Sequence, residues 1–284
     1  MHPNENTMIE RFNALRLKPG EVAVCHLGQH SFILKLGGTV IYLDPYLTPD
    51  RSRLIAPLLT PAAVTNAAIV TASHDHGDHL DRPAWPGIAA ASPDAVFIVP
   101  EAVRQSVLKE TGIAKTRVLG LNDGGSIESK GVKISAVAAA HEFLDCDPVT
   151  GLYPYLGLII EGNGVTVYHA GDCCLYEGLQ TKLKAWAIDL ALLPINGRDA
   201  KRLKLNCIGN MTYQEAADLA GALTPSLTIP AHYDMFAMNS IDPRLFLDYM
   251  KVKYPHLNCA KPRLGTIFRH QCSGRFSPQR GRGE

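Results

Sequence analysis

The sequence predicts an α/β fold in which strands covered by helices form a layered sandwich. Short β-rich segments dominate the start of the chain, and from about residue 95 strands alternate with helical segments. Polar loops follow the ends of the strands, a pattern that favours a sandwich over a barrel. With 284 residues, 46% of them hydrophobic, the chain is long enough to bury one large core.

The first segments are expected to form an antiparallel sheet. Its strands are predicted at 21–27, 31–36 and 39–43. Gly37 and Gly38 supply the tight turn between the last two, because glycine adopts positive φ without a steric cost.

The next part of the chain predicts buried strands joined through helices. A continuous apolar strand at 67–72 leads into a histidine-rich loop, and a second strand follows at 95–99. Pro100 then opens a helix that Gly112 ends.

The second half repeats this alternation. Further strands are predicted at 132–139, 153–161, 165–169 and 189–193, with Asn163-Gly164 as the hairpin turn between the middle two. Thr212 and Glu215 match a capping box before a helix that ends near Leu223. Asp242-Pro243 opens a last helix.

These elements predict one domain. We assign residues 1–20 to an N-terminal lead segment, residues 21–270 to the domain, and residues 271–284 to a disordered, arginine-containing tail.

Composition limits the classes of partner. Lys and Arg number 28 against 27 Asp and Glu, so the chain lacks the broad positive field that nucleic-acid binding requires. No apolar run resembles a signal peptide or is long enough to span a bilayer. We therefore expect a soluble cytoplasmic protein with no nucleic-acid or membrane partner. The seven scattered cysteines indicate reduced thiols, and a homo-oligomer stays open.

The most informative motif lies in the loop after the strand at 67–72. Residues 73–79 read Ser-His-Asp-His-Gly-Asp-His, which places three imidazoles and a carboxylate at H-x-H-x-D-H spacing. Each of these groups costs free energy when buried unless a partner compensates it. A divalent cation compensates all of them together, so the spacing predicts a metal site. The competing interpretation is a solvated polar turn.

Three more candidate ligands each follow an apolar segment: His141, Asp172 and His232. Together with the loop they make seven, a number that suits two divalent ions sharing one carboxylate. The seven are His74, His76, Asp78, His79, His141, Asp172 and His232. Imidazole and carboxylate ligands suit zinc, and manganese or iron can use the same set.

This combination resembles the metallo-β-lactamase superfamily over residues 22–268. The resemblance implies an αββα sandwich, with two mixed sheets packed face to face, helices outside and the metals at one edge. It also implies ligand roles: one metal on His74, His76 and His141, the other on Asp78, His79 and His232, and Asp172 as the bridge. Asp44 matches an early aspartate that supports the ligand loop.

Within the superfamily, segments 73–81, 168–172 and 229–234 are similar to the L-ascorbate-6-phosphate lactonase group, whereas segment 193–199 departs from it. The likeness implies that a metal-bound hydroxide opens a lactone or ester of a phosphorylated, sugar-like and therefore anionic small molecule. Asp78 or Asp75 would carry the proton to the leaving group, and the sequence does not choose between them.

Candidates for substrate contact lie near these motifs. Arg198 begins a run of four cations and predicts a phosphate clamp, against the alternative of a solvated loop face. The others are Asn196, Tyr233 and His30. For His30, a core histidine is the competing interpretation.

Two other activities stay open. A phosphodiesterase of the same superfamily would use the same metals, although near-neutral charge argues against RNA as its substrate. A di-iron redox protein is the third possibility.

Overall fold

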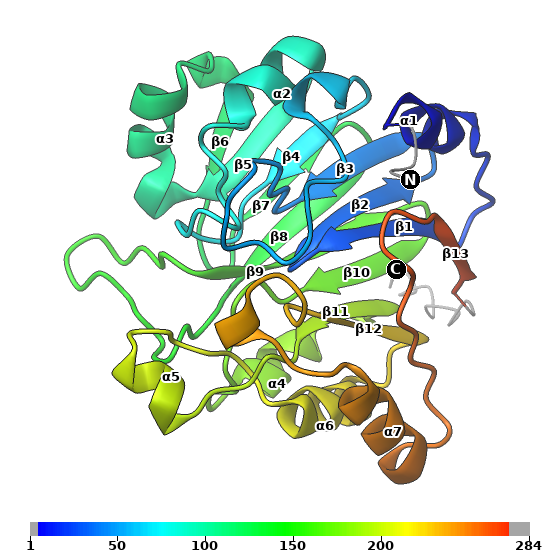
Figure 1. Ribbon diagram of the computed structural model, residues 1–284. Helices are drawn as coiled ribbons and strands as arrows, with labels where there is room; N and C mark the ends of the chain where they lie inside the picture. The colour runs from blue at the N-terminus through cyan, green and yellow to red at the C-terminus, as the bar shows by residue number, and fades with distance from the viewer. Residues whose placement is uncertain (1–4, 273–284) are drawn as a thin grey trace, which may run out of the picture.

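Two β-sheets pack face to face in the computed structural model, which describes residues 5–272 (Figure 1). The first sheet has seven strands in the order β13-β1-β2-β3-β4-β5-β6. They are β1 (Glu21–Gly28), β2 (Ser31–Leu36), β3 (Thr39–Leu43), β4 (Ile69–Thr71), β5 (Val96–Pro100), β6 (Val118–Leu121) and β13 (Phe268–Gln271). Strands β13 to β3 pair antiparallel, and β3 to β6 pair parallel.

The second sheet has six strands in the order β12-β11-β10-β9-β8-β7. They are β7 (Ser126–Ser129), β8 (Val132–Ala138), β9 (Leu156–Gly162), β10 (Val165–His169), β11 (Leu190–Pro194) and β12 (Leu227–Ala231). The pairs from β7 to β10 are antiparallel and those from β10 to β12 are parallel. Both sheets are therefore mixed.

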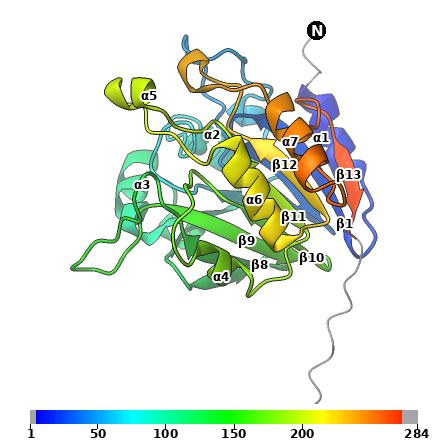
Figure 2. The ribbon, with the colours of Figure 1, turned by 90° about the horizontal axis from the view of Figure 1, so that it is seen from below.

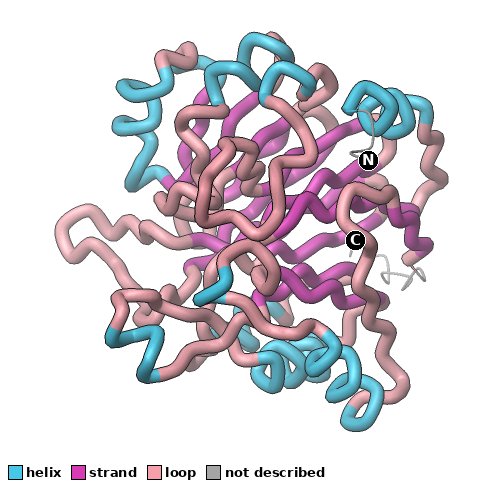
Figure 3. The backbone as a smooth tube through the Cα atoms, in the orientation of Figure 1, coloured by secondary structure: helices cyan, strands magenta, loops and turns pink. Residues whose placement is uncertain are grey.

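Helices cover the outer faces of both sheets (Figures 1 and 3). Those beside the first sheet are α1 (Glu5–Ala14), α2 (Trp85–Ala91) and α3 (Arg104–Thr111). Those on the side of the second sheet are α4 (Leu179–Leu183), α5 (Ala200–Lys204), α6 (Tyr213–Leu223) and α7 (Arg244–Lys253). Figure 2 shows α6 and α7 lying across β11 and β12. The predicted αββα sandwich is confirmed.

Three apolar layers hold this arrangement together. Phe32, Ile41 and Leu192 belong to the layer between the sheets, where alternate residues of facing strands meet. Trp85 belongs to the layer beneath the first group of helices, and Phe246 to the layer beneath the second. Burial of this apolar surface is the main favourable contribution to folding.

Local signals in the sequence fit the structure at several element ends. Gly37 and Gly112 both have positive φ, the first in the β2–β3 turn and the second at the end of α3. The capping box of α6 is present: Glu215 N–H donates to Thr212 Oγ1 (3.2 Å), and Thr212 N–H donates to the Glu215 carboxylate (2.8 Å). The seven cysteines are free thiols.

Helix α1 is an element that we did not predict within the lead segment 1–20. Its Met8, Ile9 and Phe12 are buried in the outer layer of the first sheet. The buried Lys35 ammonium of β2 donates to the Phe12 carbonyl (2.6 Å) and satisfies one of the carbonyls that a helix end leaves free. This helix therefore belongs to the domain that we began at residue 21.

Strand β13 corrects the other boundary. Gln271 pairs with Glu21 at the edge of the first sheet, so the predicted tail does not begin before residue 272. Residues 273–284 of that tail lie outside the described residues. Within the described range, no helix is both long and apolar enough to cross a bilayer.

Replacing Phe12 by alanine tests the contribution of α1. Because the ring is fully buried, we expect the free energy of unfolding to fall by about 3–5 kcal/mol, as urea denaturation would measure. Arg11→Ala at the neighbouring exposed position is the control, with an expected change within about 0.5 kcal/mol. Equal stabilities for both variants would contradict the packing of α1.

Candidate metal centre

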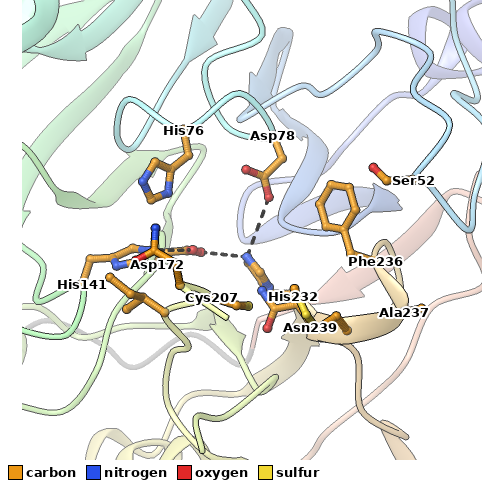
Figure 4. A pocket seen from close by; sticks show the side chains of 13 residues that line it. Ser52, His76, Asp78, His141, Asp172, Cys207, His232, Phe236, Ala237 and Asn239 are labelled. Atoms are coloured by element: carbon orange, nitrogen blue, oxygen red, sulfur yellow. Dashed lines mark ion pairs between the residues drawn. The ribbon is translucent and has the colours of Figure 1, made fainter. Parts of the chain in front are cut away.

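The seven predicted ligands come together at one end of the sandwich, each from a loop after a strand. The loop with His74, His76, Asp78 and His79 follows β4. His141 follows β8, Asp172 follows β10 and His232 follows β12. Figure 4 shows His76 and Asp78 on one side of a cavity. The side chains of His141, Asp172 and His232 lie on the opposite side.

One group of ligand atoms comprises His74, His76, His141 and Asp172, all within 4.8 Å of one another. His74 Nε2 lies 3.0 Å from His76 Nδ1. Asp172 Oδ2 lies 3.5 Å from His141 Nε2 and 4.0 Å from His74 Nε2. Neutral imidazole nitrogens and a carboxylate oxygen at this spacing suit a transition-metal ion.

A second group, Asp78, His79 and His232, lies on the other side of the same aspartate. Asp172 Oδ1 lies 3.2 Å from both His79 Nε2 and His232 Nε2. Asp78 Oδ2 lies 3.7 Å from His79 Nε2 and 3.9 Å from His232 Nε2. The two oxygens of Asp172 thus face different groups, as a shared carboxylate would.

The Asp44 carboxylate orients the His79 ring directly and the His74 ring through Ser73. The buried Asp44 carboxylate accepts from His79 Nδ1 (2.7 Å), from Ser73 N–H (2.9 Å) and from the Ser73 hydroxyl. Ser73 Oγ lies 3.0 Å from His74 Nδ1. Because its own hydrogen is donated to Asp44, it accepts a hydrogen bond from His74 Nδ1–H. With Nδ1 protonated in both rings, Nε2 of each neutral imidazole carries a lone pair that points into the centre.

Two buried atoms that face each other without a hydrogen bond test whether a metal fits this centre. His79 Nε2 and Asp172 Oδ1 face each other, and neither has a hydrogen-bond partner within the described residues. A lone pair facing a buried carboxylate oxygen is unfavourable until a proton or cation lies between them. The donor set therefore fits a divalent metal.

The pKa shifts follow the same electrostatics. Burial lowers the pKa of His74 well below its usual value, so this ring stays neutral. Burial opposes ionisation of Asp172, but the charges of His232 and His79 hold its pKa well below the usual range. Burial would lower the pKa of His79, yet the Asp172 and Asp78 carboxylates raise it well above. Without a metal, the His79 ring therefore holds a proton between these carboxylates, and a cation that binds there takes the place of that proton.

Unusual backbone conformations concentrate at the centre. Gln29, Asp44 and His232 have φ of 55°, 44° and 57°, in the left-handed region that side chains other than glycine avoid. Gly171 has φ of 60°, and a Cβ there would lie 2.8 Å from the Leu156 carbonyl oxygen. Only glycine fits beside Asp172, and such strain is typical of functional sites.

Both groups open into a cavity of about 680 Å³. Five of the ligands line it, and an apolar wall stands opposite. The lining residues are Ser52, His76, Asp78, His141, Asp172, Asn206, Cys207, Ile208, His232, Phe236, Ala237, Met238 and Asn239. Two loops join beside the cavity, where Leu54 N–H donates to the Met235 carbonyl (2.8 Å).

The structure separates the two candidate proton carriers. Asp78 lines the cavity, with its side chain 19% exposed. Asp75 instead forms an ion pair with Arg82 and does not line the cavity. The placement favours Asp78 over Asp75, whose carboxylate is paired outside the cavity, as the proton carrier.

Arg198 also lies elsewhere than predicted. Its guanidinium donates to both oxygens of Glu215 (2.6 and 2.7 Å) and to the Asn210 carbonyl (3.1 Å). It lines a smaller hollow of about 150 Å³ beside the main cavity. An arginine with its fork on a carboxylate cannot clamp a phosphate in the same geometry, so this placement does not support the predicted clamp.

The other three substrate candidates are buried behind the cavity wall. Asn196 Nδ2 donates to Asn239 Oδ1 (2.8 Å), so it positions a lining residue. Tyr233 packs near the His26 ring and does not line the cavity. His30 is buried with Nδ1 3.9 Å from Asp172 Oδ1. Their role as direct substrate contacts is not supported by this placement.

Several cavity residues escaped the sequence analysis. Ser52, Cys207, Phe236 and Asn239 lie in loops whose sequences contain no ligand spacing. Gln29 is adjacent to His30, and its Nε2 donates to Asp78 Oδ2 (2.7 Å). Its position at the β1–β2 turn could have indicated a site residue. The sequence analysis selected the neighbouring His30, because histidine is the more common metal ligand.

An αββα sandwich with two adjoining His/Asp groups beneath a cavity defines a class of metallohydrolase. The Beta-lactamase superfamily domain matches residues 39–233, and the chain belongs to this superfamily. It is 30% identical to a UPF0173 metal-dependent hydrolase of Aeropyrum pernix, over 78% of this chain and 86% of that protein. It is also 28% identical to a UPF0173 metal-dependent hydrolase of Sulfurisphaera tokodaii, over 78% of this chain and 88% of that protein.

A solved structure shows the same fold. Igni18, a novel metallo hydrolase from Ignicoccus hospitalis, aligns with a TM-score of 0.66 and 22% identity, over 88% of this chain and 98% of that one. The protein is a metal-dependent hydrolase of this superfamily. Its likeness to the ascorbate-phosphate lactonase group stays a prediction.

Asp44→Asn tests the support of the ligand loop. The amide can keep the size of the side chain but not the charge that orients His79, so we expect metal affinity to fall about 10- to 100-fold. Competition with a chelator would measure it, and circular dichroism would check the fold. Unchanged affinity in a folded variant would contradict the role of Asp44.

Proposed function

We propose that this protein hydrolyses a lactone or ester of a sugar-like small molecule at a dinuclear metal centre. The convergence of six His and Asp ligands on a seventh, Asp172, at a site open to a cavity carries the proposal. Zinc and manganese are the metals that we expect, and iron suits the same donors. The cytoplasm is the expected compartment.

The ligands divide into two sets that share Asp172. His74, His76 and His141 would hold one ion, and Asp78, His79 and His232 the other. When bound, such ions lower the pKa of water and polarise a carbonyl group. This chemistry suits ester cleavage, which needs a nucleophile at neutral pH and stabilisation of the developing oxyanion.

The residues of the chain add positioning and proton transfer. Asp78 reaches the cavity and is the carboxylate that we assign to carry a proton to the leaving alkoxide. Phe236, Met238 and Ile208 form the apolar wall against which a ring-shaped substrate would pack. A cavity of about 680 Å³ suits a monosaccharide-sized molecule better than a polymer.

The charge of the lining bears on the substrate. No lysine or arginine lines the cavity within residues 5–272. Arg202, like Arg198, is occupied: it donates to Asp199 (2.7 Å) and to the Asn196 carbonyl (2.8 Å). The proposed substrate is therefore a lactone or ester without a required phosphate group. Any negative charge that it carries would be stabilised by the metal ions.

Metal removal tests the proposal directly. We expect chelated protein to lose lactone hydrolysis and to regain it with Mn²⁺ or Zn²⁺, because the ligands supply no nucleophile themselves. A panel of lactones, carboxylic esters and bis(p-nitrophenyl) phosphate would rank the substrates. Undiminished hydrolysis by metal-free protein would end the proposal, and faster phosphodiester cleavage would replace it.

His76→Ala should separate catalysis from folding. His76 is exposed to the cavity, so its loss should leave the fold intact while kcat/KM falls by about 100-fold or more, at least the loss seen for supporting residues. His256→Ala, at an exposed position in the turn after α7 and outside the cavity lining, is the matched control. Full activity of the folded His76 variant would remove this residue from the centre.

Arg198→Ala examines the abandoned phosphate clamp. We expect the KM for a phosphorylated lactone and the KM for its dephosphorylated analogue each to stay at the wild-type value, because the guanidinium is bound to Glu215. Stability should fall by about 0.5–1 kcal/mol, the usual range for a partly exposed ion pair. A rise in KM confined to the phosphorylated substrate would restore the clamp.

A further inference from the structure

Gln29 places an amide directly beside two ligands of the second metal group. Its side chain is fully buried, and Nε2 lies 2.7 Å from Asp78 Oδ2 and 3.0 Å from His232 Nε2. Its Oε1 has no hydrogen-bond partner within the described residues. The amide therefore joins the carboxylate and the imidazole that an ion in this group would need.

The backbone holds Gln29 in this place. Its N–H donates to Asp234 Oδ1 (2.8 Å), and its carbonyl accepts from His232 N–H (2.7 Å) and from His26 Nε2 (3.1 Å). Gln29 and His232 both have φ near 56°, the conformation that side chains tolerate only under such constraint. The contact between amide and ligands is built into the fold.

An amide nitrogen has no lone pair for a metal, and its hydrogens occupy the acceptor atoms of the ligands. The N–H to the Asp78 carboxylate is a charge-assisted hydrogen bond, stronger than one between neutral groups. An ion must displace the amide to reach the lone pair of His232 Nε2 and the Oδ2 atom of Asp78. In the first group the corresponding contact joins two of the ligands, His74 Nε2 and His76 Nδ1 (3.0 Å), rather than a ligand and a residue from outside the group.

We propose that Gln29 competes with the second cation and makes the two metal sites unequal. One divalent ion binds tightly at His74, His76, His141 and Asp172, and a second binds more weakly at Asp78, His79 and His232. This inference rests on the proposed metal-dependent function and adds the residue that sets the metal stoichiometry. The neutral amide satisfies the second set of ligands when only the first ion is present.

Zn²⁺ binding to the full-length chain tests this competition. Chelated protein is dialysed against buffered Zn²⁺ over a range of free concentrations, and elemental analysis gives the ions bound per chain. Gln29→Ala removes the competing amide, and Gln29→Glu keeps its shape but exchanges the donor for a charged ligand. Gln180→Ala, at an exposed position on α4, is the matched control.

The wild-type chain should bind one zinc tightly and a second more weakly. In Gln29→Ala the second ion should bind about tenfold tighter or more, as expected from the loss of a competing charge-assisted hydrogen bond, with the first unchanged. Gln29→Glu should tighten the second ion further, and Gln180→Ala should match the wild type. If the alanine variant does not fold, the near-isosteric glutamate variant decides.

Two equally tight ions in the wild type would overturn the inference. So would a second site that either Gln29 variant weakens or leaves unchanged, because the amide would then assist the ion or play no part. In both cases intact metal-dependent hydrolysis would leave the proposed function standing. Absence of any zinc binding, together with metal-independent hydrolysis, would instead remove the proposed function.

Discussion

The buried carboxylate of Asp172 is the interaction on which the rest of the structure depends. It lies where loops of both sheets meet, with one oxygen toward His79 and His232 and the other toward His141. A charge buried to this degree is costly without compensation. The glycine before it, the strained backbone around it and the imidazoles from several loops all place compensating groups within reach of one carboxylate.

The ligands were predictable because local sequence and fold agree at these positions. Each follows an apolar strand, and strand ends of a mixed sandwich gather at the same edge. The short H-x-H-x-D-H spacing restricts four side chains to one turn, so a single loop supplies ligands to both groups. Asp44, directly after β3, was predicted only through the resemblance to the superfamily.

Side chains whose role depends on a distant partner were not predictable. Glu215 was foreseen as a capping residue, but a carboxylate has acceptor capacity to spare, and Arg198 uses it. Arg82 neutralises Asp75 in the same manner. The apolar positions of α1 look unremarkable in the sequence, since their meaning comes from the sheet on which they pack. No local sequence pattern predicts that the loops with Cys207 and Asn239 line the cavity.

Both ligand sets cross the boundary between the two sheets. The contributions of the first half of the chain end at His79, and those of the second half begin at His141. Neither half alone holds a complete set, so a metal ion bound by either group would connect the two halves of the sandwich. Metal binding would then be linked to the packing of the two sheets: separation of the sheets would release the metal, and the free energy of metal binding would stabilise the packed state.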